Sequence, residues 1–569
     1  MPPYSVPAES KRVLKEGILD HPSHQDLPAE CRHVFDLVKF EGHGEPRMAI
    51  NWRFAESVCA LKGLEAILLN VLLRRKYGLP YQEVVINTDH AQLFLMSCLI
   101  QEVGPSTPDS PVKPTELREL NAQYSQYFPS WDLHEQVSTL YRKAVTNIYR
   151  CRDGSMFHLH ASLNPDPSLE AIGLPRDRPE LVTNDDAWAP IISKMAEKDA
   201  TEWDHILADE FRQACTKCFT PEEYARTEQG KAQAGIGLYQ IHHHPDTSQR
   251  AGWWQSIEAT SVRRPLAGLK VVDLTRIVAG PSISRGLAEL GASVMRVTGP
   301  HIADFSGLHP DLNWGKWNCH LDLRQQEDRT KFRDLILGAD VIVNGYRPGV
   351  LDKYGASFED VFKLGKERGR GFIYVRECCF GWVGPWAHRA GWQPISDACS
   401  GVSMGFGKAI GLDNEAVTPV LPNSDYCTGI AGACATLQAL MLQEQQGGSF
   451  LIDTALNYYN RWLVEQVGEY SPEIWHEVWT RNGRQVFRHF HNMNYTLPHY
   501  MKMFQKEGLF DLDFFELRET KALGLKIRTP KPVLRFPEGT VELGFNVGTR
   551  GNGVDQPYWP SDLSTEIVK

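Results

Sequence analysis

The sequence contains no hydrophobic run long enough to cross a membrane. Its longest apolar stretch, residues 63–73, is interrupted by Glu65 and Asn70, whereas a spanning helix needs roughly 20 predominantly apolar residues. The first 30 residues are polar and proline-rich, and they lack the basic start and apolar block of a secretory signal. We therefore expect a cytoplasmic protein without a membrane partner.

Long runs of one charge are also missing. The 569 residues include 60 basic and 70 acidic side chains, for a formal net charge of −10, and neither sign is concentrated in a block. This distribution argues against nucleic acid as a partner, because such binding surfaces carry clustered lysine and arginine. An anionic ligand would need a local pocket. With 42% hydrophobic residues, the chain has enough apolar side chains to form its own core.

Neither a disulfide framework nor a metal site is indicated. The twelve cysteines are scattered along the chain, which is typical of reduced core thiols in a reducing compartment. Cys215 and Cys218 have the spacing of half a zinc site, but no second pair follows them. Three histidines at 242–244 precede Pro245, and because proline marks a loop we expect them in a solvated linker. We therefore predict no bound metal.

What the sequence does contain is an alternation of strands and helices that begins near residue 265. Residues 269–275 predict a buried strand, 282–290 a helix that stops at Gly291, and 292–297 a second strand. The pattern continues in the predicted helices 331–337 and 429–443 and the predicted strands 340–343, 372–375 and 449–453. Such alternation builds a mostly parallel sheet covered by helices.

The residues before this region have a different organisation. Residues 186–218 have a helical pattern, and the polar stretch 229–252 is interpreted as a connection, with a boundary between about 250 and 262. Residues 149–160 predict a β-hairpin, because Asp153 and Gly154 favour the backbone conformation of a tight turn. The chain is therefore expected to consist of two halves.

The two halves share one local pattern. In the first half Glu56 opens a predicted apolar helix over 57–75, and in the second half Asp425 stands just before the predicted helix 429–443. A strand follows each helix. Any helix favours an acidic residue at its start, which explains part of the coincidence.

The second half resembles a known family, the class III CoA-transferases or CaiB/BaiF family. The resemblance covers roughly residues 265–456 and is specific, because five separated stretches agree in order and spacing. These stretches are residues 265–281 with 287–292, 315–316 with 320–323, 345–351, 380–386 and 423–429. Residues 527–560 also look like the C-terminal tail of the family.

The resemblance implies an α/β fold: a doubly wound, mostly parallel sheet with a smaller α+β domain. The first half matches more faintly, and it resembles the part of a family member that follows the catalytic position, so the chain looks like two fused copies. Family members form interlocked dimers, which implies an internal pseudo-dimer here and leaves a homodimer open. The implied domains are a degenerate CoA-transferase-like half at 1–250, a linker at 251–264, a nucleotide-binding-like domain with the catalytic aspartate at 265–456, and a C-terminal region with the tail at 457–569.

The resemblance points to Asp425 as the nucleophile. It implies transfer of CoA between an acyl-CoA donor and a carboxylic acid acceptor, through an aspartyl anhydride and an aspartyl-CoA thioester. Independently, a carboxylate with an ordinary pKa near 4 is ionised at pH 7 and can attack a thioester carbonyl. The helix expected from Gly429 would favour the resulting oxyanion at its N-terminal end. A plain helix cap is the alternative reading of this residue. Coenzyme A thioester would be a substrate, with no permanently bound cofactor.

The resemblance also implies residues that contact CoA. Arg276 and Ala279 stand where the first turn of the family contacts CoA, while Tyr346, Arg347 and Lys353 follow the third strand, at the edge where open α/β sheets bind ligands. Arginine and lysine can pair with the phosphates of CoA. Three positions depart from the family pattern and make these contacts less secure: Thr298, Trp317 and Gly345.

Two other functions stay open. The family includes α-methylacyl-CoA racemases, whose catalytic histidine aligns with Trp392 here, and an indole cannot carry a proton near neutral pH. A CoA-binding protein without turnover is motivated by the three altered positions. In the first half, Glu56 is one methylene longer than aspartate, which would displace a nucleophile by about 1 Å. We therefore expect one working site per chain.

Overall fold

A seven-stranded sheet forms the centre of the computed structural model, which describes residues 4–105, 110, 112, 125–258 and 260–569. Its strands are β7 (Tyr239–His244), β8 (Lys270–Leu274), β9 (Ser293–Thr298), β10 (Lys316–His320), β11 (Val341–Asn344), β12 (Ile373–Cys378) and β13 (Ser449–Ala455). Six are parallel in the order β10-β9-β8-β11-β12-β13, and β7 joins β13 antiparallel. The predicted mostly parallel sheet is confirmed. Its order reverses between β8 and β11, a switch point at which open α/β sheets bind ligands.

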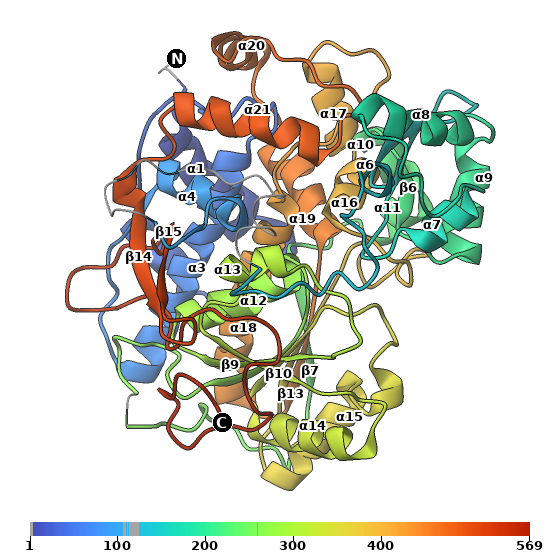
Figure 1. The fold of residues 1–569 in the computed structure, drawn as a ribbon. Coiled ribbons are helices and arrows are strands. Elements are labelled where there is room, and N and C mark those ends of the chain that lie inside the picture. The colour runs from blue at the N-terminus through green and yellow to red at the C-terminus, as the bar shows by residue number, and fades with distance from the viewer. Residues whose placement is uncertain (1–3, 106–109, 111, 113–124, 259) are drawn as a thin grey trace.

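Helices cover both faces of this sheet, because neighbouring residues of a buried strand point to opposite sides. In β8, Val271 packs in one apolar cluster with Ile283 of α12, whereas Val272 packs in another with Phe332 of α14. The covering helices are α12 (Ala279–Glu289) with α18 (Asn423–Gln446), and α14 (Gln326–Gly338) with α15 (Phe358–Arg368). Figure 1 shows α14 and α15 together at one side of the sheet.

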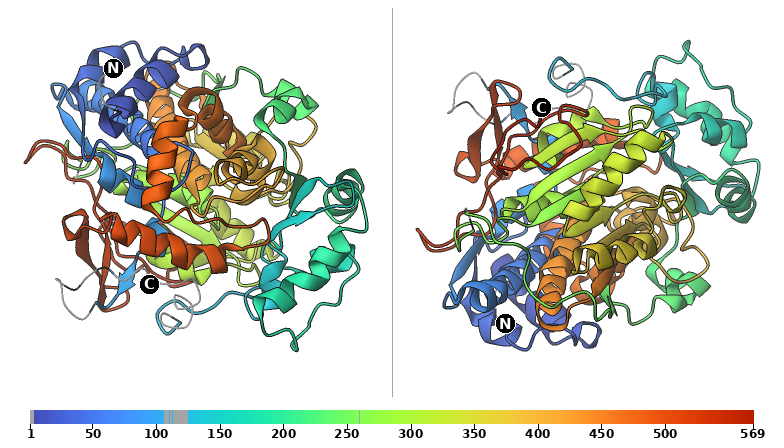
Figure 2. Two further views of the ribbon diagram at one scale, coloured as in Figure 1. Left: turned by 90° about the horizontal axis from the view of Figure 1, so that it is seen from above. Right: turned by 90° about the horizontal axis from the view of Figure 1, so that it is seen from below.

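Helix α18 is buried along most of its length and lies between the two halves. It crosses α12 closely, and a Cβ added at Gly429 would lie 2.4 Å from the Cβ of Ser282. Its neighbour is α3 (Phe54–Tyr77), which, like α18, has 24 residues. Figure 2 shows α3 in blue beside α18 in orange. The two halves therefore share one apolar core.

The rest of the first half surrounds α3 and reaches the C-terminal region. Around α3 lie α1 (Val6–Leu14), α2 (Cys31–Val34), α4 (Thr88–Phe94) and the parallel pair β1 (Val38–Glu41) and β2 (Val84–Asn87). The strand β3 (Glu102–Val103) pairs with β15 (Leu525–Pro530), which pairs in turn with β14 (Phe515–Thr520). The tail of the chain is thus hydrogen-bonded to the first half.

A small unit over residues 140–217 stands to one side of the central sheet, drawn in teal in Figure 1. The strands β4 (Asn147–Arg150) and β5 (Met156–Leu159) form the predicted hairpin, and β6 (Cys215–Lys217) pairs with β5. The helices of the unit are α6 (Leu140–Ala144), α7 (Asp166–Ala171), α8 (Asn184–Met195) and α9 (Ala200–Asp204). The predicted helical pattern over 186–218 is wrong at its end, because pairing with the hairpin edge satisfies the backbone there. Cys215 and Cys218 are both buried and free.

The stretch predicted as a polar connection contains the strand β7. His243 stacks on Phe450 with ring centroids 4.6 Å apart, and His242 lies 3.3 Å from Asp453. An edge strand has one unpaired side and tolerates polar side chains. The histidines therefore lie in a strand and not in the predicted linker, although His242 and His243 are exposed to solvent as expected. Before β7 the chain forms α10 (Pro221–Arg226) and α11 (Glu228–Ala232).

Helix α18 begins at Asn423, ahead of the start predicted at Gly429. Ser424, Asp425 and Thr428 have modest helix propensity, because their side chains compete for backbone hydrogen bonds. The whole first turn is buried, however, so tertiary packing decides its conformation. Asp425 is consequently the third residue of the helix and lies inside its first turn.

The described residues form six further α-helices. They are α13 (His309–Leu312), α16 (Gln393–Ser400), α17 (Val402–Ala409), α19 (Leu456–Trp462), α20 (Pro472–Arg481) and α21 (Met493–Lys506). Within the described ranges, no helix combines the length and the apolar character that a membrane span requires.

Candidate active site

Two cavities meet at the edge of the central sheet. The first, here called the sheet-edge cavity, has a volume of about 440 Å³, and the second, here called the apolar cavity, has a volume of about 530 Å³. Five of the described residues line both: Ser162, Leu163, Ile277, Trp392 and Asp425. Asp425 therefore lies where the two spaces join.

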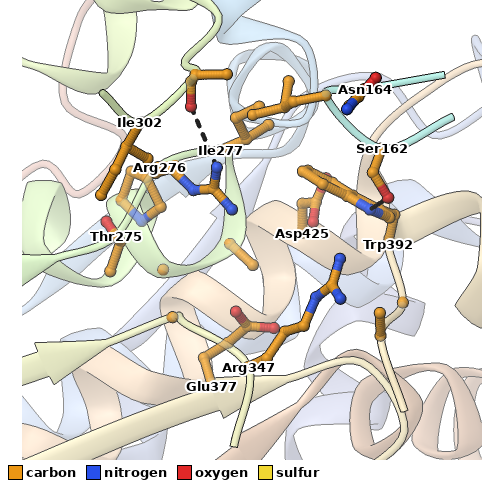
Figure 3. Close-up of a pocket in the computed structure, with 18 of the residues that line it drawn as sticks. Ser162, Asn164, Thr275, Arg276, Ile277, Ile302, Arg347, Glu377, Trp392 and Asp425 are labelled. Carbon is orange, nitrogen blue, oxygen red and sulfur yellow. Dashed lines mark hydrogen bonds between the residues drawn. The ribbon is translucent and has the colours of Figure 1, made fainter. Parts of the chain in front are cut away.

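The sheet-edge cavity is built from residues that follow successive parallel strands. Arg276 follows β8, Ile302 follows β9, Arg347 follows β11, and Glu377 lies near the end of β12. Because the carboxyl ends of parallel strands meet at one edge, the fold brings these separated residues together at the switch point between β8 and β11. Figure 3 shows Arg276, Arg347 and Glu377 around the space that Asp425 faces.

The Asp425 side chain is buried but does not cap its helix. It is 9% exposed, and among the described residues no group donates a hydrogen bond to its carboxyl. The unpaired amide groups at the start of α18 give this end of the helix a partial positive charge. The Asp425 carboxyl, which has no hydrogen-bond donor among the described residues, is therefore available to a ligand in either cavity.

Burial raises the pKa of Asp425 well above its ordinary value, and negative charge on Glu377 and Asp397 raises it further. Burial also raises the pKa of Glu377 and of Asp397, each to about 8. Asp397 accepts hydrogen bonds from Asn460 and Gln393, which partly oppose this shift. These surroundings thus favour the neutral acid at position 425, in contrast to the ionised group expected from the reference pKa.

Arg276 and Arg347 form a cationic wall in the sheet-edge cavity. Within the described part of the chain neither has a carboxylate partner: Arg276 donates to the carbonyl oxygen of Ala303 at 3.1 Å, and Arg347 to that of Arg212 at 3.2 Å. Burial and the nearby Arg276 lower the pKa of Arg347. Two guanidinium groups without acidic partners favour an anionic ligand such as a phosphate.

The other residues predicted to contact CoA lie at different depths. Ala279, the first residue of α12, lines the sheet-edge cavity. Tyr346 lies behind the cavity wall, with its ring 5.4 Å from the guanidinium of Arg276. Lys353 lies over the ring of Tyr354 and, like Tyr346, is not among the described residues that line the cavity. The structure therefore places Arg276, Ala279 and Arg347 at the cavity, together with Asp425.

Of the three residues that depart from the family pattern, one, Gly345, lines the sheet-edge cavity. Trp317 is buried against the C-terminal segment and donates from Nε1 to the carbonyl oxygen of Thr565 at 2.9 Å. The hydroxyl of Thr298 donates to the carbonyl oxygen of Cys319 at 3.2 Å. Two of the altered side chains are thus accommodated within the protein.

The small unit supplies a wall of the site that the sequence did not reveal. Nε1 of Trp392 donates to Oγ of Ser162 at 3.0 Å, and its ring stacks on His160 at 5.3 Å. Ser162 has a φ of 53°, which is uncommon for a residue with a side chain. No local pattern marks Ser162 or His160, because only the fold brings them to Trp392. Glu377 was also missed, although a carboxyl near the end of a parallel strand is a usable signal.

Glu56 is placed quite differently from Asp425, although it is likewise the third residue of its helix. Its carboxyl accepts hydrogen bonds from the hydroxyls of Tyr4 and Tyr470, and it lies 4.0 Å from the guanidinium of Arg53. It lines neither cavity in the described part of the structure. Its hydrogen bonds give it a structural role.

Comparison with known proteins identifies the family. The profile of CoA-transferase family III matches residues 266–497. Over 99% of its length, the chain is 47% identical to the acetyl-coenzyme A transferase nodX of Hypoxylon pulicicidum, and it covers 95% of that protein. The chain belongs to CoA-transferase family III. It is thus a CoA-transferase, an enzyme that acts on acyl-CoA.

Two further similarities accompany this family III assignment. The acyl-CoA transferase of Gibberella moniliformis is 29% identical, over 82% of this chain and 83% of its own. A solved structure of a CAIB/BAIF family protein from Brucella suis shares 26% identity with a TM-score of 0.31, and the match covers 40% of this chain and 60% of that one.

Proposed function

We propose that this enzyme transfers CoA from an acyl-CoA donor to a carboxylic acid acceptor, with Asp425 as the nucleophile. The observation that carries the proposal is the position of the Asp425 carboxyl, which has no hydrogen-bond donor among the described residues and lies where two cavities join. Arg276 and Arg347 fit the phosphates of CoA on one side of it. The apolar cavity offers space for an organic group on the other.

The first stage of the proposed reaction attaches CoA to the enzyme. The ionised Asp425 attacks the thioester carbonyl of the donor, the carbon–sulfur bond breaks, and the acyl group stays on Asp425 as a mixed anhydride while CoA leaves as a thiolate. The thiolate then attacks the aspartyl carbonyl. The donor acid departs as a carboxylate, and Asp425 carries CoA as a thioester.

In the second stage of the proposed reaction, the same steps run in reverse with the acceptor. The acceptor carboxylate attacks the aspartyl-CoA carbonyl, which forms a new anhydride and releases the CoA thiolate. The thiolate attacks the acyl carbonyl that came from the acceptor, forms its CoA thioester and regenerates the Asp425 carboxylate. No oxidant or permanently bound cofactor is needed, because each step exchanges one acyl bond for another.

The surroundings of Asp425 suit this chemistry. The N-terminal end of α18 stabilises both the carboxylate and the negative charge that develops on an attacked carbonyl. Glu377, with a pKa of about 8, is mostly protonated at neutral pH, so its repulsion of the Asp425 carboxylate grows only as the pH approaches 8. Burial also limits access of water, which would hydrolyse the anhydride.

The proposal extends to the architecture. We interpret the central sheet and the small unit as the doubly wound domain and the smaller α+β domain of the class III fold, held within one internal pseudo-dimer. The support is the packing of α3 against α18, two helices of 24 residues with an acidic third residue. In this interpretation residues 1–250 descend from a second copy that has kept its structural role.

Covalent trapping tests the nucleophile. The enzyme is incubated with acetyl-CoA and hydroxylamine, which cleaves an aspartyl anhydride or thioester to a hydroxamate. We expect progressive inactivation and, by peptide mass spectrometry, a hydroxamate on Asp425 that the Asp425→Asn variant does not form. Consumption of the thioester without modification of Asp425 would contradict the mechanism.

The racemase alternative has less support from the site. Trp392 takes the position at which family racemases carry histidine, and its only polar atom already donates to Ser162. Exchange of deuterium at C2 of a branched acyl-CoA in heavy water, retained after Trp392→Ala, would favour a racemase. Tight CoA binding without exchange among a panel of acids would instead favour a CoA-binding protein without turnover.

A further inference from the structure

The apolar cavity differs in its chemistry from the sheet-edge cavity on the other side of Asp425. Both halves of the chain line it, since it is enclosed by the small unit, the turn at Ser97–Leu99, the loop before α18 and the start of α21. Apolar atoms form most of its wall, with side chains that include Leu99, Val137, Phe305, Leu308, Val420 and Met493. Arg276 and Arg347 line the sheet-edge cavity and not this one.

The polar groups of the apolar cavity are mostly uncharged at neutral pH. Burial lowers the pKa of His158 to about 4 and that of His160 well below its ordinary value. Nδ1 of His160 accepts a hydrogen bond from the Ser162 amide at 2.9 Å, so the proton of the neutral ring is on Nε2. Lys143 is the single Lys or Arg among the described lining residues, and it already has an interaction partner.

We infer that the apolar cavity binds the organic part of the acceptor, and that this acceptor is a bulky, mainly apolar monocarboxylic acid. The inference rests on the proposed role of Asp425, which fixes the reacting carboxylate where the two cavities join. The rest of the acceptor then extends into the apolar cavity. The donor acid leaves by the same space before the acceptor enters.

Charge argues for a single carboxylate. The second carboxylate of a dicarboxylic acid would be buried among apolar atoms and neutral imidazoles, where an unpaired anion loses its hydration without compensation. An isolated hydroxyl or carbonyl of the acceptor is acceptable, because Nε2 of His160 offers an uncharged donor.

Size argues for a bulky acid. A cavity of about 530 Å³ lies within the range of pockets that hold drug-sized ligands, roughly 300–1,000 Å³. Acetate or oxalate would leave most of this apolar wall uncovered. Each methylene that the acceptor buries is expected to raise kcat/KM about fourfold.

An acceptor series tests the inference with the full-length enzyme and acetyl-CoA as donor. We measure kcat/KM for straight-chain monocarboxylic acids from propionate to decanoate and for the dicarboxylic acids of equal length. The expected result is an increase of more than about 100-fold along the monocarboxylic series, with each long dicarboxylic acid at least about tenfold poorer than its monocarboxylic counterpart. Two results would overturn the inference. One is a higher kcat/KM for small acids than for long ones. The other is a higher kcat/KM for a dicarboxylic acid than for its monocarboxylic counterpart, if this difference is lost in Lys143→Met.

A variant that narrows the cavity supplies an independent test. Thr418 lines the apolar cavity but not the sheet-edge cavity, and it is partly exposed, so a larger side chain can be accommodated. In Thr418→Trp we expect the ratio of kcat/KM for decanoate to that for propionate to fall at least about tenfold. The control is Thr330→Trp, an exposed position on α14, where the ratio should not change. An unchanged ratio in a folded Thr418→Trp protein would overturn the inference.

These outcomes are distinguishable from failure of the proposed function. Trapping of Asp425 with acetyl-CoA and hydroxylamine needs no acceptor. A trapped Asp425 together with a preference for small or doubly charged acids would leave the nucleophile intact and reject only the acceptor class. Absence of trapping would reject the nucleophile itself.

Discussion

Two acidic residues show how surroundings decide the role of a side chain. Asp425 and Glu56 are each the third residue of a buried helix of 24 residues. Glu56 is held by Tyr4, Tyr470 and Arg53, whereas Asp425 has no hydrogen-bond donor among the described residues. The local sequence pattern is shared, but only Asp425 of the two lines the cavities in the described part of the structure.

The first prediction concerns the nucleophile. Asp425→Asn should leave the fold unchanged, because the amide is nearly isosteric, and it should lower CoA exchange at least about 100-fold, because an amide does not form the anhydride. Exchange between labelled CoA thioesters and free acids measures the effect, with circular dichroism as the control for folding. A variant that keeps more than a few per cent of the activity would contradict it.

The second prediction concerns pH. Asp425 must lose its proton to react, and its pKa is raised by burial first and then by negative charge on Glu377 and Asp397. The rate of enzyme–CoA formation should therefore rise with pH, and the rising limb of the pH–rate profile should have an apparent pKa well above the ordinary range of an aspartate.

Removing the negative neighbour makes deprotonation easier, so Glu377→Gln should move this limb to lower pH. The matched control is Glu359→Gln, an exposed position on α15, which should leave the profile unchanged. Because Glu377 itself has a pKa of about 8, the two carboxyls titrate as a coupled pair, and the profile reports the pair. A limb that stays in place in Glu377→Gln would show that the two groups do not interact.

The third prediction concerns the other acid. Glu56→Gln should leave turnover within a factor of a few, since Glu56 lines neither cavity, but it should lower the thermal unfolding midpoint because Arg53 loses a charged partner. Trapping should give one labelled residue per chain. Two equivalents, one of them on Glu56, would show that the first half is also active.

At the level of elements, the sequence predicted the regular parts of the fold and missed those that depend on distant contacts. Most of the strand and helix alternation after residue 265 was readable because the predicted strands contain apolar runs, such as residues 341–343. The strand β10 was not predicted, because Lys316, Asn318 and His320 interrupt its apolar pattern. The strand β7 was not, because its histidines are polar and its order comes from pairing with β13. The early start of α18 was missed for the same reason: burial outweighs the weak propensity of its first turn.

The candidate site was also predicted only in part from the sequence. Asp425, Arg276, Ala279 and Arg347 lie in the part of the chain that resembles the class III family, so the resemblance could propose them. Ser162 and His160 belong to the small unit and reach Trp392 only through the fold. The apolar cavity was unpredictable, because its walls come from segments that no local pattern links.

The fourth prediction concerns the crossing of α12 and α18. A Cβ at Gly429 would lie 2.4 Å from the Cβ of Ser282, whereas a Cβ at Gly286 would lie 3.4 Å from the Cβ of Ala433. Gly429→Ala should therefore destabilise the protein by about 1–3 kcal/mol. Gly286→Ala is the control and should change stability by less than about 1 kcal/mol, because alanine favours the helix. Denaturant unfolding measures both, and equal stability of the two variants would contradict the close approach.

At the scale of the whole molecule, the two halves are interlocked. The helix α3 packs against α18, β3 pairs with β15, β7 completes the edge of the central sheet, and Trp52 bridges to Glu469. The first half also lines both cavities through Ser162 and Leu163. Removing it would expose apolar helix surface and an unpaired strand edge.

The fifth prediction follows from this interlocking. A chain that begins at residue 262 should be insoluble, because it loses α3 and β7 together and exposes apolar helix surface and the edge of β13. Fractionation after expression measures this, with the full-length chain as the control. A soluble, monomeric fragment with CoA-transferase activity would show that the first half is dispensable.

Both walls of the cavities belong to one chain, and this affects how the active site depends on protein concentration. An active site shared between separate subunits forms only when the subunits meet, so it is lost on dilution. Here the residues on both sides of Asp425 are covalently linked, and the local concentration of one wall around the other is set by the chain itself. Dilution therefore cannot separate the two walls around Asp425.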